Sequence, residues 1–260
     1  MKMRLMVVLC TLALMGCTPQ VDHGSLGPGP TNGESLPTGE FDVVAADVRY
    51  FEDFSGTYAH PSVEGDYPGV VMIHEWWGLN QNIKDMASTL ASQGYHVLAV
   101  DLHGTVATTP EQARALTGSL DQQKALANMN AALAFLKSKG ATKTASLGWC
   151  FGGGQSLQLA LNEPLDATVI YYGRLETNET MLSAITWPVL GIFGATDQSI
   201  PVATVNEFDA ALTALGREHE INIYPGVGHA FANPSGANYA PNETKDAWDK
   251  TLAFLDKHLK

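Results

Sequence analysis

Short apolar segments alternate with longer amphipathic segments along most of this chain. Continuous apolar runs, typical of strands buried on both faces, lie at 68–73, 95–100, 144–147, 166–172, 187–193 and 221–224. Segments with helical periodicity separate them, at 82–92, 110–117, 121–138 and 155–161. Ahead of these, residues 41–54 and 56–60 predict a hairpin. This alternation predicts one α/β domain over 41–260, with a mainly parallel, twisted sheet and helices on both faces.

A glycine-rich junction follows one of the predicted strands, where Gly148 and Gly152 flank Cys150. Small residues two positions before and after a nucleophile allow a tight strand-to-helix turn that exposes it. The helix N-terminus there favours a thiolate, and the next amide faces a developing oxyanion. The pattern predicts Cys150 as a nucleophile, with a buried, inert cysteine as the structural alternative.

Two more ionisable residues follow predicted strands further along the chain. Asp197 comes after the run at 187–193, and His229 after the run at 221–224. Taken separately, Asp197 could be a turn or capping residue for a helix near Pro201, and His229 an ordinary loop histidine. The chain order of nucleophile, acid and histidine nevertheless matches a catalytic triad on a parallel sheet. The sequence therefore predicts that Cys150, Asp197 and His229 act together.

With these motifs, the chain from about 41 to 259 resembles the dienelactone hydrolase family of the α/β-hydrolase superfamily. Besides the cysteine junction, the matching stretches are His74–Asn80, Val100–Gly104, Tyr171–Gly173, Gly194–Asp197 and Tyr224–Phe231. The resemblance implies an α/β-hydrolase fold and an enzyme that hydrolyses esters or lactones. It implies that Cys150 is the nucleophile, Asp197 the acid that orients the histidine, and His229 the base.

The resemblance also gives a role to Glu75, matching a glutamate that interacts with the thiol and helps switch it from a resting to an active state. The backbone amides of Phe151 and Trp76 would form the oxyanion hole. Glu75 follows the apolar run at 68–73, so it is expected at the sheet edge beside the nucleophile. The structural alternative is that Glu75 caps the following helix. A zinc-protease motif is excluded because Gly78 replaces its second histidine, and we expect neither a metal nor a cofactor.

The substrate is expected to be a small ester or lactone other than the anionic dienelactone, attacked by the thiol to give a thioester. Where the resemblance places two carboxylate-binding arginines, this sequence has Thr105 and Asn233, and Arg114 is the nearest arginine to the first position. Their loss favours a less charged substrate. The aromatic residues expected to line the pocket, or alternatively to belong to the core, are Trp77, Trp149, Tyr172 and Phe231.

The N-terminus is typical of a bacterial lipoprotein signal. Lys2 and Arg4 precede an apolar run at 5–15 that is too short to span a bilayer permanently. Residues 1–16 are predicted to be the signal peptide, with Cys17 as the lipid attachment site. Residues 17–40 would then be a flexible tether rich in Gly, Pro, Ser and Thr. The alternative is an ordinary signal peptide, because Met15 is not the usual small residue.

These features predict a lipid-anchored protein of the cell envelope. Thr18 is not the aspartate associated with inner-membrane retention, so a Gram-negative host would place it at the outer membrane, facing the periplasm. Loss of Lys2 and Arg4 with the signal would change the formal charge from −12 to −14. So acidic a chain lacks the basic face that nucleic acid requires. We expect a monomer whose only remaining thiol after processing is Cys150.

Two other function classes remain open from the sequence. A non-catalytic binding lipoprotein could use a hydrolase scaffold, although Cys150, Asp197 and His229 are all retained. A thiol redox protein would use Cys150 alone and would normally need a resolving cysteine, which the processed chain lacks.

Overall fold

The computed structural model describes residue 36 and residues 38–260, and within them eight strands form a single sheet. The predicted signal peptide at 1–16, Cys17 and most of the predicted tether at 17–40 lie outside the described residues. The strands are β1 (Val43–Phe51), β2 (Phe54–Pro61), β3 (Gly69–Ile73), β4 (His96–Val100), β5 (Thr144–Trp149), β6 (Ala167–Tyr171), β7 (Val189–Gly194) and β8 (His219–Tyr224). Their order across the sheet is β1-β2-β4-β3-β5-β6-β7-β8.

The strands from β3 to β8 run parallel, and the hairpin of β1 and β2 joins them antiparallel through β4. Every residue of β3, β4, β5, β6 and β7 is buried, which explains why these strands appear in the sequence as unbroken apolar runs. The predicted parallel α/β sheet is therefore confirmed.

The leading hairpin differs from its prediction in the position of the turn. The chain reverses at Glu52 and Asp53, and Phe54 already belongs to β2. Glu52 has a positive φ of 43°, and the pairing register shifts between Arg49 and Phe51. A local bulge of this kind cannot be recognised from the alternation of apolar residues alone.

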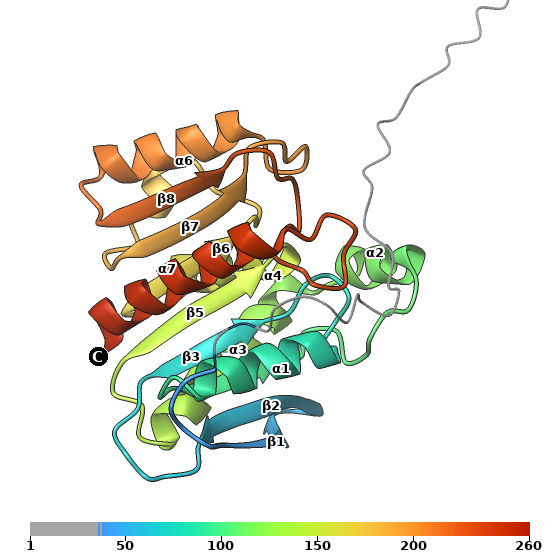
Figure 1. Cartoon of the computed structure of the whole chain (residues 1–260), viewed down its shortest axis with the longest axis vertical. Helices are drawn as coiled ribbons and strands as arrows, with labels where there is room; N and C mark the ends of the chain where they lie inside the picture. Colours follow the sequence, from blue (N-terminus) through green and yellow to red (C-terminus); the bar gives the residue numbers. More distant parts are fainter. Residues whose placement is uncertain (1–35, 37) are drawn as a thin grey trace, which may run out of the picture.

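Helices cover both faces of the sheet (Figure 1). They are α1 (Gln81–Ala91), α2 (Pro110–Gly118), α3 (Gln122–Ser138), α4 (Phe151–Asn162), α5 (Glu179–Leu182), α6 (Val202–Ala214) and α7 (Pro241–Leu259). Figure 1 shows α1 and α7 in front of the sheet and α3 and α4 behind it. The front core includes Trp248 of α7 and Ile83 of α1, and the rear core includes Met129 of α3 and Phe208 of α6. No helix among residues 38–260 is both long and apolar enough to cross a membrane.

Polar side chains begin the helices on the front and at the rim of the sheet. Asn80 caps α1 by accepting a hydrogen bond from the Ile83 amide at 3.2 Å, and Thr109 caps α2, with Pro110 as its first residue. Because Asn80 fills the capping position, the capping alternative for Glu75 is wrong. Glu75 is left in the loop between β3 and α1, at the carboxyl edge of the sheet.

Candidate active site

Cys150 occupies the tight turn between β5 and α4. Its φ of 53° and ψ of −116° are strained for a residue with a side chain. A Cβ atom on Gly148 would lie 2.1 Å from the carbonyl oxygen of Gly152, and one on Gly152 would lie 2.3 Å from the carbonyl oxygen of Ile73. Both flanking positions must therefore be glycine for the backbone to pass, which is the physical reason for the motif.

The three predicted triad residues lie together although they come from three different strand ends. His229 Nε2 lies 3.0 Å from Cys150 Sγ, and His229 Nδ1 lies 2.8 Å from Asp197 Oδ2. The other carboxylate oxygen of Asp197 accepts hydrogen bonds from the amides of Ser199 and Ile200, at 2.7 and 3.0 Å. Asp197 therefore shapes its own turn and also orients the histidine, so the two interpretations of this residue are compatible.

The surroundings of His229 favour its protonated form. Burial alone would lower the pKa of this imidazole, but the hydrogen bonds to Asp197 and Cys150 outweigh burial and raise the pKa to about 10. At neutral pH the imidazole therefore carries a positive charge beside the sulfur. A positively charged imidazole next to the sulfur is the arrangement that activates a cysteine nucleophile.

Glu75 lies beside the triad, with only 4% of its surface exposed. Burial raises the pKa of its carboxyl to about 7, although His229 and Asn233 act in the opposite direction. The side-chain amide of Asn233 donates a hydrogen bond to Glu75 Oε2. Among the described residues the thiol is hydrogen-bonded to His229 and not to Glu75. The structure thus shows the cysteine turned toward its base while Glu75 is held by Asn233.

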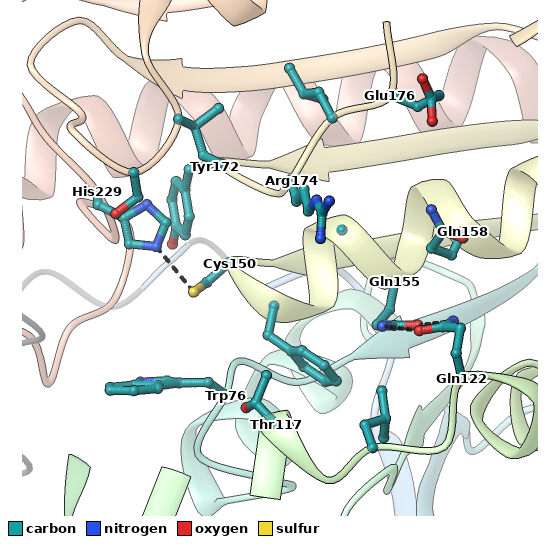
Figure 2. Close-up of a pocket in the computed structure, with 16 residues that line it drawn as sticks. Trp76, Thr117, Gln122, Cys150, Gln155, Gln158, Tyr172, Arg174, Glu176 and His229 are labelled. Atoms are coloured by element: carbon teal, nitrogen blue, oxygen red, sulfur yellow. Dashed lines mark hydrogen bonds between the residues drawn. The ribbon is translucent and has the colours of Figure 1, made fainter. Parts of the chain in front are cut away.

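A cavity of about 660 Å³ opens over the thiol, and Figure 2 shows Cys150 and His229 at one end of it. Phe151 and Trp76, the two predicted oxyanion-hole residues, both line it. Phe151 is the first residue of α4, where backbone amides have no partner within the helix. Tyr172, predicted as a pocket residue, also lines the cavity, and its ring packs against His229 with centroids 5.3 Å apart.

The other predicted pocket aromatics do not line this cavity. Trp149 and Phe231 are buried in the front core, which was the alternative open from the sequence, and Trp149 also borders a very small pocket beside Glu75. Trp77 packs in a small cluster with Ala107 and Ala113, and it borders only a minor pocket beside the triad. The prediction was therefore wrong for the large cavity at Trp77, Trp149 and Phe231.

Several polar residues of the cavity were missed from the sequence. They are Gln122, Gln155, Gln158, Arg174 and Glu176. Arg174 comes two residues after Tyr172 in the loop that follows β6, so a search for charged residues after each strand would have found it. It lies outside the two positions, Thr105 and Asn233, on which the expectation of a less charged substrate was based.

The positions that carried the substrate prediction lie elsewhere. Thr105 is exposed and does not line the large cavity. Asn233 donates a hydrogen bond to Glu75. Arg114 lies over the ring of Trp76, with its guanidinium carbon 5.7 Å from the ring centroid. Among residues 38–260 no group of three or more His, Cys, Asp or Glu side chains is arranged to hold a metal ion.

Comparison with known proteins agrees with this arrangement. The model of the dienelactone hydrolase family matches residues 54–259, which includes every strand from β2 onward. The chain belongs to the dienelactone hydrolase family. The family resemblance and the hydrolase class predicted from the sequence are therefore confirmed: dienelactone hydrolases act on ester and lactone bonds.

Individual members of the family are similar to this chain over most of its length. A candidate carboxymethylenebutenolidase of Saccharolobus solfataricus is 30% identical, covering 72% of this chain and 88% of the relative. A protein of a Bradyrhizobium species, named as a candidate 2-oxo-3-(5-oxofuran-2-ylidene)propanoate lactonase, is 31% identical over 77% of this chain and 88% of its own. The crystal structure of a candidate dienelactone hydrolase from Klebsiella pneumoniae superposes with a TM-score of 0.77 at 26% identity, covering 83% of this chain and 99% of the other.

Proposed function

We propose that this protein hydrolyses carboxylic esters or lactones with Cys150 as the nucleophile, through a thioester intermediate. The observation that carries the proposal is the continuous series of hydrogen bonds from Cys150 Sγ through His229 to Asp197, placed at the end of a 660 Å³ cavity. Nucleophile, base and orienting acid are the three groups that acyl transfer requires.

In the first half of the reaction, the Cys150 thiolate attacks the substrate carbonyl carbon and a carbon–sulfur bond forms. The carbonyl oxygen becomes an oxyanion, which the amides of Phe151 and Trp76 stabilise. Collapse of this intermediate breaks the bond to the ester oxygen. The leaving alkoxide takes the proton that His229 holds, and the thioester remains.

In the second half, neutral His229 removes a proton from water, and the resulting hydroxide attacks the thioester carbonyl. The carbon–sulfur bond then breaks, which releases the carboxylic acid and returns the thiolate beside protonated His229. Thiolate is a better leaving group than an amine, so the thiol favours esters and lactones over peptides. In a lactone the alcohol stays attached to the acyl chain and leaves with the product.

Glu75, which borders a small pocket together with Cys150 and His229, is proposed to assist this cycle. Its carboxyl has a pKa of about 7, so near neutral pH it exists in both protonation states. Its hydrogen bond to Asn233 keeps it off the sulfur while His229 is engaged. The protein can thus rest with its cysteine already paired to the base.

The substrate proposed here is an ester or lactone other than the anionic dienelactone. Two relatives carry names that refer to lactone substrates, which supports a small cyclic or acyclic ester. The positions implied to bind the dienelactone carboxylate hold Thr105 and Asn233, and neither side chain contributes a positive charge. A thiol redox role is less well supported for two reasons. The described residues contain Cys150 as their single cysteine, and this cysteine is hydrogen-bonded to His229, which in turn is bonded to Asp197.

Anchoring in the cell envelope through Cys17 remains part of the proposal. Its support is the sequence of residues 1–17 and the tether that follows. Detergent phase partitioning of the full chain and of Cys17→Ser tests it: the native chain should enter the detergent phase and the variant should not. Equal partitioning of both would contradict lipidation.

The central experiment is intact-mass spectrometry of the domain from Pro19 onward, mixed with neutral aryl esters and lactones and quenched early. We expect an acyl adduct on Cys150 that decays in the native protein and persists in His229→Ala. Cys150→Ala should show no adduct. An adduct elsewhere, or none with any ester or lactone, would contradict the cysteine hydrolase.

A further inference from the structure

Arg174 lines the cavity from the loop that follows β6, and its side chain is exposed. In Figure 2 its guanidinium is directed toward α4, between Cys150 and Gln158. Arg174 forms no ion pair or hydrogen bond with another described side chain. The planar guanidinium group of arginine has five N–H donors, two of which can bind the two oxygens of a carboxylate together.

The loop that carries Arg174 packs closely on the first turn of α4. A Cβ atom on Gly173 would lie 2.3 Å from the carbonyl carbon of Gly153, and one on Gly154 would be in ordinary contact with the Cβ of Arg174 at 3.4 Å. Gly154 lies four residues after Cys150, which is one helical turn, or about 6 Å along the axis. A substrate carboxylate bound by Arg174 would therefore be separated by several covalent bonds from the substrate carbonyl that Cys150 attacks.

The nearby carboxylate of Glu176 forms no ion pair with Arg174. Glu176 Oε1 accepts hydrogen bonds from the amides of Thr177 and Asn178, at 3.0 and 2.8 Å, so it is tied to its own loop. Figure 2 shows Glu176 farther out than Arg174. Arg174 and Glu176 therefore both line the cavity, and no ion pair between them occupies the guanidinium.

The rest of this end is lined by amides. Gln122 and Gln155 donate hydrogen bonds to each other, at 2.8 and 2.9 Å, and form a polar floor. The Gln158 side chain lies beside Arg174 in Figure 2 and also lines the cavity. These amides can accept or donate hydrogen bonds to a polar group without adding charge.

We infer that Arg174 is a specificity-determining residue that binds a carboxylate on the ester substrate, with Gln158 as a neutral hydrogen-bonding neighbour. The inference rests on the proposed ester hydrolysis at Cys150. This anion subsite lies on the β6 side of the cavity, along α4, and not at Thr105 or Asn233. The fitting substrates are esters whose carboxylate is separated from the reacting carbonyl by about two to four carbon atoms.

The test compares two esters with the same leaving group, mono-4-nitrophenyl glutarate and neutral 4-nitrophenyl valerate. For the anionic ester, Arg174→Gln should lower kcat/KM by about tenfold or more, mostly through KM, because a charge-assisted hydrogen bond is lost. For the neutral ester the change should stay within about twofold. Arg174→Lys should retain part of the preference, since it keeps the charge but not the fork. Added salt should weaken the native preference.

Arg49→Gln is the matched control, because Arg49 loses the same charge from β1 at the far edge of the sheet. It should leave both kcat/KM values unchanged. Hydrolysis of both esters with a ratio that Arg174→Gln does not alter would overturn the anion subsite while leaving the hydrolase standing. Absence of any acylation of Cys150 by either ester would instead contradict the proposed function.

Discussion

The two ends of the cavity are built in different ways. At the thiol end, Cys150, Asp197 and His229 come from the ends of β5, β7 and β8, and each is held by a hydrogen bond to another of them. At the other end, Arg174 and Glu176 share one loop and do not bind each other. The first end is fixed by the sheet, whereas the second depends on a single loop.

This difference separates chemistry from selectivity. The triad residues follow three neighbouring elements of one parallel sheet, of which β5 and β7 are fully buried, so the core helps to fix their geometry. The loop after β6 can change its side chains without disturbing those strands. We therefore expect substitutions at the thiol end to abolish turnover of every ester, and substitutions at the arginine end to change only which ester is preferred.

The largest expected effect is that of His229→Ala. Hydrolysis should fall by about 1,000-fold or more for neutral and anionic esters alike, because both proton transfers are lost. Alkylation of Cys150 by iodoacetamide should change as well. Near neutral pH it should be slower in the variant than in the native protein, because the variant lacks the imidazole beside the sulfur. Identical alkylation profiles would contradict the proposed thiolate–imidazolium pair.

Asp197→Asn should cause a smaller loss, about 100-fold or more in kcat/KM, because the histidine loses its orienting charge. The chain offers a matched control in Asp209, which contacts His219 Nε2 at 3.0 Å far from the cavity. Asp209→Asn should leave hydrolysis unchanged. Equal activities of the two variants would contradict the role of Asp197.

Glu75→Gln should alter the pH dependence of stability. The folded-state pKa of Glu75, about 7, exceeds its ordinary value of 4.5, so the folded state binds more protons between these values. The native free energy of unfolding should therefore fall relative to the variant as pH rises from about 4.5 to 7, by on the order of 3 kcal/mol. Urea unfolding at pH 4.5, 6 and 8 measures it.

Exposed Glu218 provides the comparison for that experiment. Glu218→Gln keeps Glu75, so its free energy of unfolding should fall between pH 4.5 and 7 as it does in the native protein. Removing Glu218 adds no change over this range, because the hydrogen bond and ion pair with Lys257 lower the pKa of Glu218. A difference between native protein and Glu75→Gln that stays constant with pH would show that the Glu75 carboxyl titrates normally.

The smallest expected effect belongs to Glu176→Gln at the arginine end. Removing this negative charge should raise kcat/KM for the anionic ester by about twofold and leave the neutral ester unchanged. A decrease for the anionic ester would mean that Glu176 helps to hold the substrate. The same loop would then act through two residues instead of one.

The residues at the thiol end could be predicted because each of them follows a strand of the parallel sheet. Cys150, Asp197 and His229 each follow an apolar run, and parallel strands bring such residues to one edge. Arg174 obeys the same rule, since it follows β6 closely, but a single charged residue after a strand does not by itself distinguish a site residue from an exposed loop residue.

Burial of the aromatic residues could not be predicted in the same way. Trp149 and Phe231 adjoin Cys150 and His229 in the sequence, yet their side chains enter the core while those of Cys150 and His229 face the site. Which face a side chain takes at a strand end depends on local backbone angles, such as the positive φ of Cys150 and Tyr172. The hydrogen bond from Asn233 to Glu75 likewise joins residues 158 positions apart, and no periodic pattern indicates it.

The close contact between Gly148 and Gly152 also sets which changes the site can tolerate during engineering. The flanking positions have no room for even one methyl group, so a library varied there would yield misfolded chains. The side chain of Cys150 faces the cavity, where a hydroxyl would fit in place of the sulfur. A designer can therefore exchange the reacting atom itself more freely than the two glycines that present it.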